Sequence, residues 1–329
     1  MSVTVQDGLV AEIEALGQRA AAARTEVGRI IFGQDEVVDQ VLICLLSGGH
    51  VLLVGVPGLG KTLLVETLGT VLGLAPKRVQ FTPDLMPADI IGSEVLDEDA
   101  SGRRSFRFVS GPVFCQLLMA DEINRASPRT QSALLQAMAE GKVAVGGVDH
   151  PLPRPFHVLA TQNPIEQEGT YPLPEAQLDR FLLQVDVSYP DLANERTMLL
   201  ATTGAEAARA RTVLSGSELM AAQALIRRIP VGEKVVDAIL ALVRGARPES
   251  ATDASIRQHV AWGPGPRAAQ ALMLASRARA LLDGRLSPSL DDVAALAHPV
   301  LRHRMALNFS ARAEGVMLAE VIAGLVRGL

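Results

Sequence analysis

The octapeptide at residues 55–62 requires a strand, a tight loop and a helix in succession; its residues are Gly55, Val56, Pro57, Gly58, Leu59, Gly60, Lys61 and Thr62. The apolar run His50–Val54 before it lacks the alternation of a half-buried strand, and a helical pattern follows over Lys61–Leu72. Between such flanks the glycines let backbone N–H groups turn around phosphate oxygens, and the helix N-terminus faces the same anion. An ordinary glycine-rich turn is the alternative. The flanks favour a phosphate-binding loop, with Lys61 on the β- and γ-phosphates and Thr62 as a ligand of Mg²⁺.

A second motif is the acidic pair Asp121 and Glu122, which follows the apolar run Leu117–Ala120. Asp121 would hold Mg²⁺ directly or through water, and Glu122 would orient and polarise an attacking water. Taken alone, an acidic pair after a strand is more often the start of a helix, where it meets the favourable end of the dipole. Its place at the end of a separate strand favours the catalytic interpretation.

Strand and helix patterns alternate over the first 190 residues. Besides His50–Val54, we predict core strands at Arg78–Phe81, Leu117–Ala120 and His157–Ala160, and a weaker one at Leu182–Val187. Helices are predicted at Asp7–Arg29, Asp35–Leu46, Lys61–Leu72 and Thr130–Glu140. This order predicts an α/β domain over residues 1–190, in which a five-stranded parallel sheet carries helices on both faces.

The pattern becomes helical after Pro190. Helices are predicted at Leu192–Thr202, Ser217–Ile229, Glu233–Val243, Pro266–Asp283, Leu290–Arg302 and Arg312–Val326. Glycine and proline residues punctuate the ends of these stretches. We therefore expect a small all-helical domain over residues 191–329.

Composition narrows the class of protein. Thirty-one Lys and Arg against 36 Asp and Glu give a net charge of −5, and aromatic residues make up 3%, so a basic nucleic-acid-binding domain or a stacking platform is disfavoured. Two separated cysteines and six scattered histidines indicate neither a disulfide framework nor a metal site. The first residues do not read as a signal peptide, and Ser47 to His50 break the uncharged stretch Val41–Gly60. We expect a soluble, cytoplasmic protein without a membrane span.

Longer motifs give the sequence a specific resemblance. The glycine-rich loop with Asp121 and Glu122 is similar to the AAA+ ATPases, and the stretches Ala120–Ala126, Arg129–Leu135 and Ala160–Phe181 closely resemble the MoxR family. The resemblance covers nearly the whole chain. It implies a P-loop AAA+ core followed by a helical lid, ATP and Mg²⁺ as cofactors, and hydrolysis of ATP to ADP and phosphate.

The resemblance also implies roles for polar residues outside the loop. Asn163 matches the sensor-1 residue, which holds the attacking water or touches the γ-phosphate; alone, it suits an Asn that caps a turn before Pro164 equally well. Arg180 matches the arginine finger that enters a neighbouring subunit's ATP site. Without the resemblance, Arg180 would be interpreted as a surface ion-pair partner. Arg267 matches sensor 2 near the start of a lid helix, and the sequence leaves open whether it serves its own subunit or a neighbour.

Two insertions resemble those of one AAA+ branch. The segment at about 82–114 is similar to the helix-2 insert and contains a predicted hairpin with arms Glu94–Leu96 and Phe106–Val109. The segment at about 142–153 is similar to the pre-sensor-1 hairpin, with arms Lys142–Val145 and Val148–Leu152 around a Gly-Gly turn. Both would face the centre of a ring and contact the molecule on which it acts. Simple surface hairpins are the alternative.

Together these motifs predict one set of site residues. The catalytic residues would be Glu122, Lys61, Asn163, Arg180 and Arg267, and the ligands of Mg²⁺ would be Thr62 and Asp121. Two of the ATP contacts lie in a loop that resembles the one packing on adenine. The full set of ATP contacts would be Gly33, Gln34, Val56, Pro57, Gly58, Leu59, Gly60, Lys61, Thr62, Leu63, Asn163 and Arg267.

The resemblance implies a homo-oligomer, a hexameric ring, that acts as a chaperone-like remodeller and matures or activates partner protein complexes. Its protein client or partner would be one with a von Willebrand factor A domain. The alternative is a nucleic-acid-acting motor of the insert-bearing branch. Against that alternative, the hairpin Lys142–Leu152 carries one Lys and no Arg. A transcriptional activator, the third hypothesis, would need a flanking DNA-binding domain.

Overall fold

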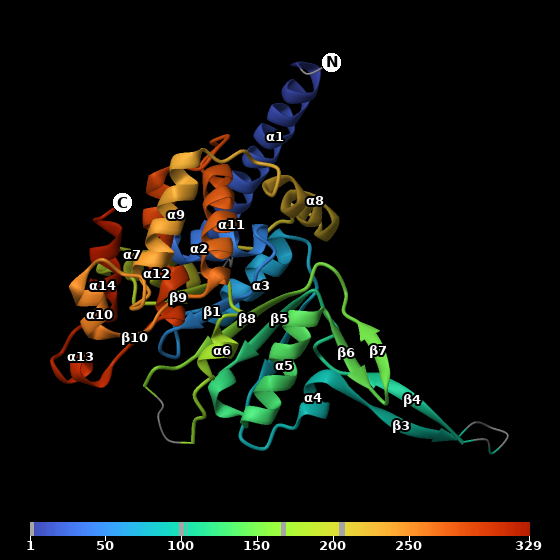
Figure 1. Ribbon diagram of the computed structural model, residues 1–329. Helices are drawn as coiled ribbons and strands as arrows, with labels where there is room; N and C mark the ends of the chain where they lie inside the picture. The colour runs from blue at the N-terminus through green and yellow to red at the C-terminus, as the bar shows by residue number, and fades with distance from the viewer. Residues whose placement is uncertain (1–2, 99–101, 103, 166–168, 204–207) are drawn as a thin grey trace.

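The computed structural model of the 329-residue chain describes residues 3–98, 102, 104–165, 169–203 and 208–329 (Figure 1). At its centre is a five-stranded sheet in the order β2-β5-β8-β1-β9, in which every pair is parallel. The strands are β1 Val51–Val54, β2 Pro76–Gln80, β5 Leu117–Asp121, β8 His157–Gln162 and β9 Leu183–Asp186. The predicted parallel sheet is therefore confirmed.

The inner strands are apolar without alternation because both faces of the sheet are covered. Along β5, Leu117 and Met119 belong to one core, and Leu118 and Ala120 belong to the other. The helices α2 (Asp35–Leu46) and α3 (Lys61–Val71) supply buried residues to the first core, and α5 (Pro128–Glu140) supplies them to the second. The edge strand β2 is mostly exposed, so the prediction of a core strand there was right in position and wrong in burial.

Two antiparallel hairpins extend from the core on the same side (Figure 1). The strand β3 (Gly92–Glu98), which follows α4 (Pro87–Ile91), pairs with β4 (Arg104–Ser110), and β6 (Lys142–Val145) pairs with β7 (Val148–Pro151). The ring of Phe108 stacks on the ring of His150 with their centroids 3.9 Å apart, so the two hairpins are joined. Both predicted hairpins are confirmed as structures. Residues 99–101 and 103 of the first loop, and residues 166–168 of the family motif, lie outside the described residues.

The C-terminal part carries most of the remaining helices: α7 Leu192–Thr202, α8 Gly216–Ile226, α9 Glu233–Gly245, α10 Ala254–His259, α11 Pro266–Leu282, α12 Leu290–Leu301, α13 Phe309–Ala313 and α14 Leu318–Val326. Two details of the prediction need correction. Short strands β10 (Val260–Trp262) and β11 (Ala306–Leu307) form an antiparallel pair, so this part is not purely helical. The single helix expected over Arg312–Val326 is broken near Gly315, whose φ of 77° leaves the helical region.

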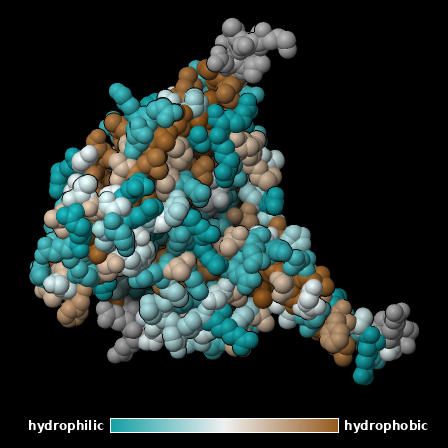
Figure 2. Space-filling view, in the orientation of Figure 1, coloured by the Kyte–Doolittle hydropathy of each residue, from teal (hydrophilic) through white to brown (hydrophobic). Residues whose placement is uncertain are grey.

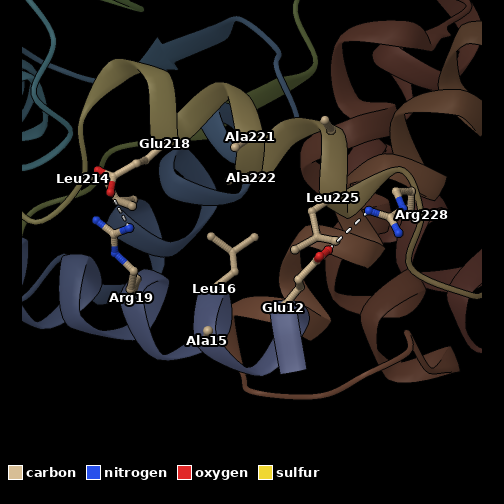
Figure 3. Close-up of a pocket in the computed structure, with 11 residues that line it drawn as sticks. Glu12, Ala15, Leu16, Arg19, Leu214, Glu218, Ala221, Ala222, Leu225 and Arg228 are labelled. Atoms are coloured by element: carbon tan, nitrogen blue, oxygen red, sulfur yellow. Dashed lines mark hydrogen bonds and ion pairs between the residues drawn. The ribbon is translucent and has the colours of Figure 1, made fainter. Parts of the chain in front are cut away.

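The N-terminal helix α1 (Val3–Gly28) contacts both the core helices and the C-terminal helices. It packs on α2 and α3 on one side and on α8 and α11 on the other. Arg19 pairs with Glu218 at 2.7 Å and Arg228 pairs with Glu12 at 3.3 Å, at the two ends of an apolar groove of about 500 Å³ (Figure 3). Within the residues described above, no helix is both long enough and apolar enough to cross a bilayer.

Candidate active site

The glycine-rich loop joins β1 to α3 and lines a cavity of about 270 Å³, here called the phosphate cavity. Gly58 and Gly60 have φ values of 84° and 72°, which glycine adopts without the strain that a Cβ would add. Gly55 serves another purpose, because a Cβ there would lie 2.5 Å from the carbonyl oxygen of Val187. The loop is open, so its backbone N–H groups and the N-terminus of α3 are arranged to receive an anion.

Lys61, the first residue of α3, folds back over this loop. Its Nζ donates hydrogen bonds to the carbonyl oxygen of Gly55 at 2.5 Å and to that of Val56 at 3.0 Å. Burial lowers the pKa of the Lys61 ammonium group, while the charges of Asp121 and Glu122 act in the opposite direction. An ionised oxygen satisfies an ammonium group better than neutral carbonyls do. Lys61 is therefore suited to exchange these carbonyls for a phosphate.

Asp121, at the end of β5, has both carboxylate oxygens engaged. Oδ1 accepts a hydrogen bond from Oγ1 of Thr161 at 2.6 Å, and Oδ2 accepts two from Arg78, at 2.6 Å from Nη2 and at 3.1 Å from Nε. Thr62 lines the same cavity. Hydroxyl and carboxylate oxygens are the donors that Mg²⁺ prefers, and Mg²⁺ sites use one or two carboxylates together with phosphates. Thr62 and Asp121 therefore fit this metal.

Glu122 is the one non-glycine residue with a positive φ, 53°, among the described residues. Its backbone N–H donates to Oγ1 of Thr161 at 2.8 Å, so a single hydroxyl holds both members of the acidic pair. Its Oε2 accepts hydrogen bonds from Nε2 of Gln80 at 2.8 Å and from Nη1 of Arg125 at 3.1 Å. The unusual backbone turns this carboxylate toward the phosphate cavity, which it lines.

Arg78, Gln80 and Thr161 line the cavity but were not predicted as site residues. The parallel pairing of β2 with β5 places Gln80 opposite Asp121, which brings both β2 side chains to the acidic pair. Nothing in the sequence of the exposed edge strand indicates this register. Thr161 could have been found, because it is a polar residue near the end of the apolar run that leads to Asn163.

Asn163 makes the turn-capping hydrogen bond expected of it, and its sensor role stays a prediction. Its side chain lines the phosphate cavity, and its Oδ1 accepts a hydrogen bond from the backbone N–H of Ile165 at 3.1 Å. The asparagine therefore caps the turn after β8 and also lies beside the predicted nucleotide. Its buried position fixes the amide at the end of the strand.

Gly33 and Gln34 line a neighbouring cavity of about 310 Å³, together with residues of β9 and α12. Nε2 of Gln34 donates to the carbonyl oxygen of Leu59 at 3.0 Å, which links this cavity to the glycine-rich loop. A Cβ on Gly33 would lie 2.5 Å from Cβ of Asn194, so the start of α7 closes over it. Val56 contributes its carbonyl oxygen to Lys61, and the side chain of Leu63 is 42% exposed; neither is among the residues that line the phosphate cavity.

The structure does not bring Arg180 and Arg267 to the phosphate cavity. Both line a separate cavity of about 290 Å³, here called the finger cavity, together with Asp179 and Arg304. Nη1 of Arg180 contacts the carbonyl oxygen of Leu135 on α5. Nε of Arg267 lies 3.9 Å from Oδ2 of Asp179 and its side chain is 61% exposed. The predicted site thus divides into two groups of residues on one chain.

Comparison with known proteins identifies two matching family models. The ATPase family associated with various cellular activities (AAA) matches residues 50–183, and the AAA lid domain matches residues 252–324. The first match contains the glycine-rich loop, the acidic pair and Arg180. The second contains Arg267 and Arg304.

Individual relatives match over most of the chain. The sequence is 44% identical over 311 residues to Chaperone MoxR1 of Mycobacterium tuberculosis, covering 94% of this chain and 80% of the relative. It is 33% identical to Protein MoxR of Paracoccus denitrificans, covering 87% and 88%. The crystal structure of a presumed ATPase from Cytophaga hutchinsonii is 34% identical, with a TM-score of 0.90 over 100% of this chain and 98% of that one.

Proposed function

Because this chain belongs to the MoxR family of AAA+ ATPases, we propose that it hydrolyses ATP to ADP and phosphate and uses that reaction to remodel a protein client. The main support is the meeting of a phosphate loop, a half-buried lysine and two carboxylates at one cavity of about 270 Å³. We assign residues 1–190 to the nucleotide-binding domain and residues 191–329 to the lid. The two matched regions, 50–183 and 252–324, fall on either side of that boundary.

The glycine-rich loop and Lys61 bind the phosphates of ATP, and Gln34 and Gly33 lie where the adenine is expected. Thr62 and Asp121 would hold Mg²⁺, which would neutralise charge on the phosphates. Arg78 donates a hydrogen bond to Oδ2 of Asp121, so this guanidinium would compete with the metal for one carboxylate oxygen.

Glu122 accepts a proton from the attacking water and orients it toward the terminal phosphate. Gln80 and Arg125 donate hydrogen bonds to its carboxylate, and Asn163 supplies an amide just after the neighbouring parallel strand β8. When the hydrogen bond from Gln80 is released, Oε2 of Glu122 has a lone pair free to accept a hydrogen bond from water. We therefore assign Glu122 as the general base and Asn163 as the residue that positions the water or the γ-phosphate.

Arg180 and Arg267 complete the site of a neighbouring subunit in a hexameric ring. The support for this assignment is their location in the finger cavity rather than beside their own glycine-rich loop. A guanidinium that stabilises transition-state charge must reach a phosphate. A second copy of the chain supplies the phosphate cavity in which it does so.

The joined hairpins contact the client. Leu96 and Phe106 face each other across the β3–β4 hairpin and are 52% and 71% exposed, and apolar surface is visible along this arm in Figure 2. Its two described arginines are paired locally, Arg104 with Glu98 and Arg107 with Asp97. This surface favours a protein over a nucleic acid, and a von Willebrand factor A domain protein in the cytoplasm is our candidate partner.

Phosphate release from Mg·ATP at increasing protein concentration tests the shared site. We expect activity per subunit to rise with concentration, because each site is completed by a neighbour, and to disappear when EDTA removes the metal. Activity per subunit that stays constant down to the monomer would contradict the shared site. Absence of phosphate release at every concentration would contradict the proposed reaction.

A pull-down identifies the client. The Glu122→Gln variant, loaded with ATP, serves as bait, and the same variant without nucleotide serves as the control. We expect a protein enriched only in the ATP-loaded sample and identified by mass spectrometry. Enrichment of DNA or RNA in its place would support the nucleic-acid motor.

A further inference from the structure

The segment Asp179–Leu182, called the finger segment after the proposed role of Arg180, is bound to a residue far along the chain. Arg304 belongs to the short 3₁₀ helix Arg302–Arg304 that follows α12. Its Nε donates to Oδ1 of Asp179 at 2.7 Å, and its Nη2 donates to the carbonyl oxygen of Phe181 at 2.6 Å. Its Nη1 donates to the carbonyl oxygen of Leu182 at 3.1 Å. One guanidinium therefore holds three of the four residues of the segment.

The contact between Arg304 and the finger segment is buried and consists of several hydrogen bonds. Arg304 is 3% exposed, and burial lowers the pKa of its guanidinium while the hydrogen bond and charge of Asp179 oppose that effect. The neighbouring His303 adds a hydrogen bond from Nε2 to the carbonyl oxygen of Phe181 at 3.0 Å. A buried charge keeps one geometry when its hydrogen-bonding sites are satisfied, because leaving a partner unmade is costly.

Arg180 lies between the residues that Arg304 holds. Asp179 and Phe181, its two chain neighbours, both accept hydrogen bonds from this guanidinium. Among the described residues, the side chain of Arg180 has one hydrogen-bond partner, the carbonyl oxygen of Leu135. Arg304 thus fixes the backbone on both sides of Arg180, while the side chain of Arg180 would leave this carbonyl in order to extend.

We propose that Arg304 is a positioning residue for Arg180, so that the finger offered to a neighbouring subunit is fixed in place by the lid of its own subunit. This inference rests on the proposed role of Arg180 across the subunit boundary. Arg304 acts through the finger segment and does not touch the nucleotide of its own subunit, since it lines the finger cavity and not the phosphate cavity. Movement of the C-terminal helices would then displace the finger directly.

A mixing experiment tests this role. Arg304→Met, Arg180→Ala and wild-type subunits are each assayed for phosphate release and for affinity toward a fluorescent ATP analogue, alone and mixed with Glu122→Gln subunits. We expect Arg304→Met to lose at least about tenfold in kcat, consistent with the rate that fingers supply, with its affinity within about twofold of wild type. Mixing should restore turnover, because the intact site of the Arg304→Met subunit then receives a finger from a Glu122→Gln neighbour.

If Arg304 only stabilised the lid, the outcome would be different. A lid damaged by the substitution would weaken nucleotide binding in its own subunit, and mixing would restore nothing. Arg279→Met is the matched control, because it also removes a guanidinium from a buried carboxylate of the lid, Asp292, but among the described residues that guanidinium bonds to Asp291 and Asp292 and not to the finger segment. This control should keep wild-type kcat.

The outcomes distinguish the positioning role of Arg304 from the finger role of Arg180. Normal kcat in Arg304→Met with loss in Arg180→Ala would overturn the positioning role alone. Normal kcat in Arg180→Ala would overturn the finger assignment and the inference with it. Should Arg304→Met fail to fold, Arg304→Lys is taken through the same mixtures, because it keeps a charge for Asp179 but replaces the three nitrogens that bond to separate residues with one. An intermediate kcat with rescue supports the inference, and loss without rescue overturns it.

Discussion

The phosphate cavity and the finger cavity are held together in opposite ways. The phosphate cavity is formed by a contiguous loop and the ends of adjacent strands, and its polar groups make exchangeable contacts: Lys61 with neutral carbonyls and Asp121 with Arg78. In the finger cavity, Arg304 forms a buried set of hydrogen bonds with a segment more than 100 residues earlier in the chain. The difference agrees with the two proposals: the first cavity would receive a ligand, and the second would hold in place a residue that acts on a neighbouring subunit.

The largest effect is expected from Lys61→Ala. Losing a charge-assisted contact to two phosphates removes about 3 kcal/mol, or roughly 100-fold in affinity, which titration with a fluorescent ATP analogue measures. Lys77→Ala, on the exposed strand β2, is the control and should bind normally. Equal affinity in both variants would end the assignment of the phosphate cavity.

Glu122→Gln should separate binding from turnover. The amide keeps the size of the side chain but cannot accept the proton of water, so kcat should fall by about 10²–10⁴-fold while ATP affinity is retained. Phosphate release and analogue titration are compared with those of Glu66→Gln, an exposed glutamate of α3. A normal kcat in Glu122→Gln would remove the general-base role.

Acid should lower the free energy of unfolding, because buried histidines lie beside the finger cavity and the finger segment. Burial and the nearby His157 lower the pKa of His50, which lines the finger cavity, to about 3, and burial also lowers that of His303 well below its usual range. Since the unfolded chain takes up these protons near pH 6.5 and the folded chain does not, stability falls as the pH drops from about 6.5 toward 3. With a folded pKa of about 3, His50 accounts for about 2 kcal/mol at pH 5.

Urea unfolding at pH 7.5, 6 and 5 checks this slope. His50→Asn keeps an acceptor for the backbone N–H of Val158, which His50 now binds through Nδ1 at 3.0 Å, and should flatten the pH dependence. An unchanged slope in this variant would show that other groups govern the acid sensitivity.

The smallest effect is expected from Arg78→Met. Arg78 is half exposed, so its ion pair with Asp121 is worth at most about 1 kcal/mol, and its loss should lower the Mg²⁺ concentration for half-maximal hydrolysis by about two- to fivefold. Arg29→Met, which removes the exposed pair with Glu26 on α1, is the control. A higher Mg²⁺ requirement would show that Arg78 assists the metal rather than competing with it.

The features predicted most accurately are those formed by residues that are adjacent in the sequence. The sheet, the open glycine-rich loop and the two hairpins correspond to local patterns, and the loop and acidic pair lie in one cavity as their positions at strand ends require. Arg78 and Gln80 could not be predicted, because the register of β2 against β5 places them, and no local pattern encodes register on an exposed edge strand.

The lid was predicted less completely, because the features that were missed also depend on pairing between distant segments. The strands β10 and β11, of three and two residues, are too short to show a period, and they exist because distant segments pair. The bonds from Arg304 to the finger segment span more than 100 residues. An arginine in a helical pattern gives no indication of such a partner.

Glu122, which we propose as the general base, has a left-handed backbone conformation that lowers the stability of the fold. A side chain other than glycine at φ 53° costs on the order of 1 kcal/mol, so glycine would relax the backbone at this position while removing the proton acceptor. The proposed role of Glu122 as general base would compensate for this strain, because the turnover that it supports would be lost with a glycine.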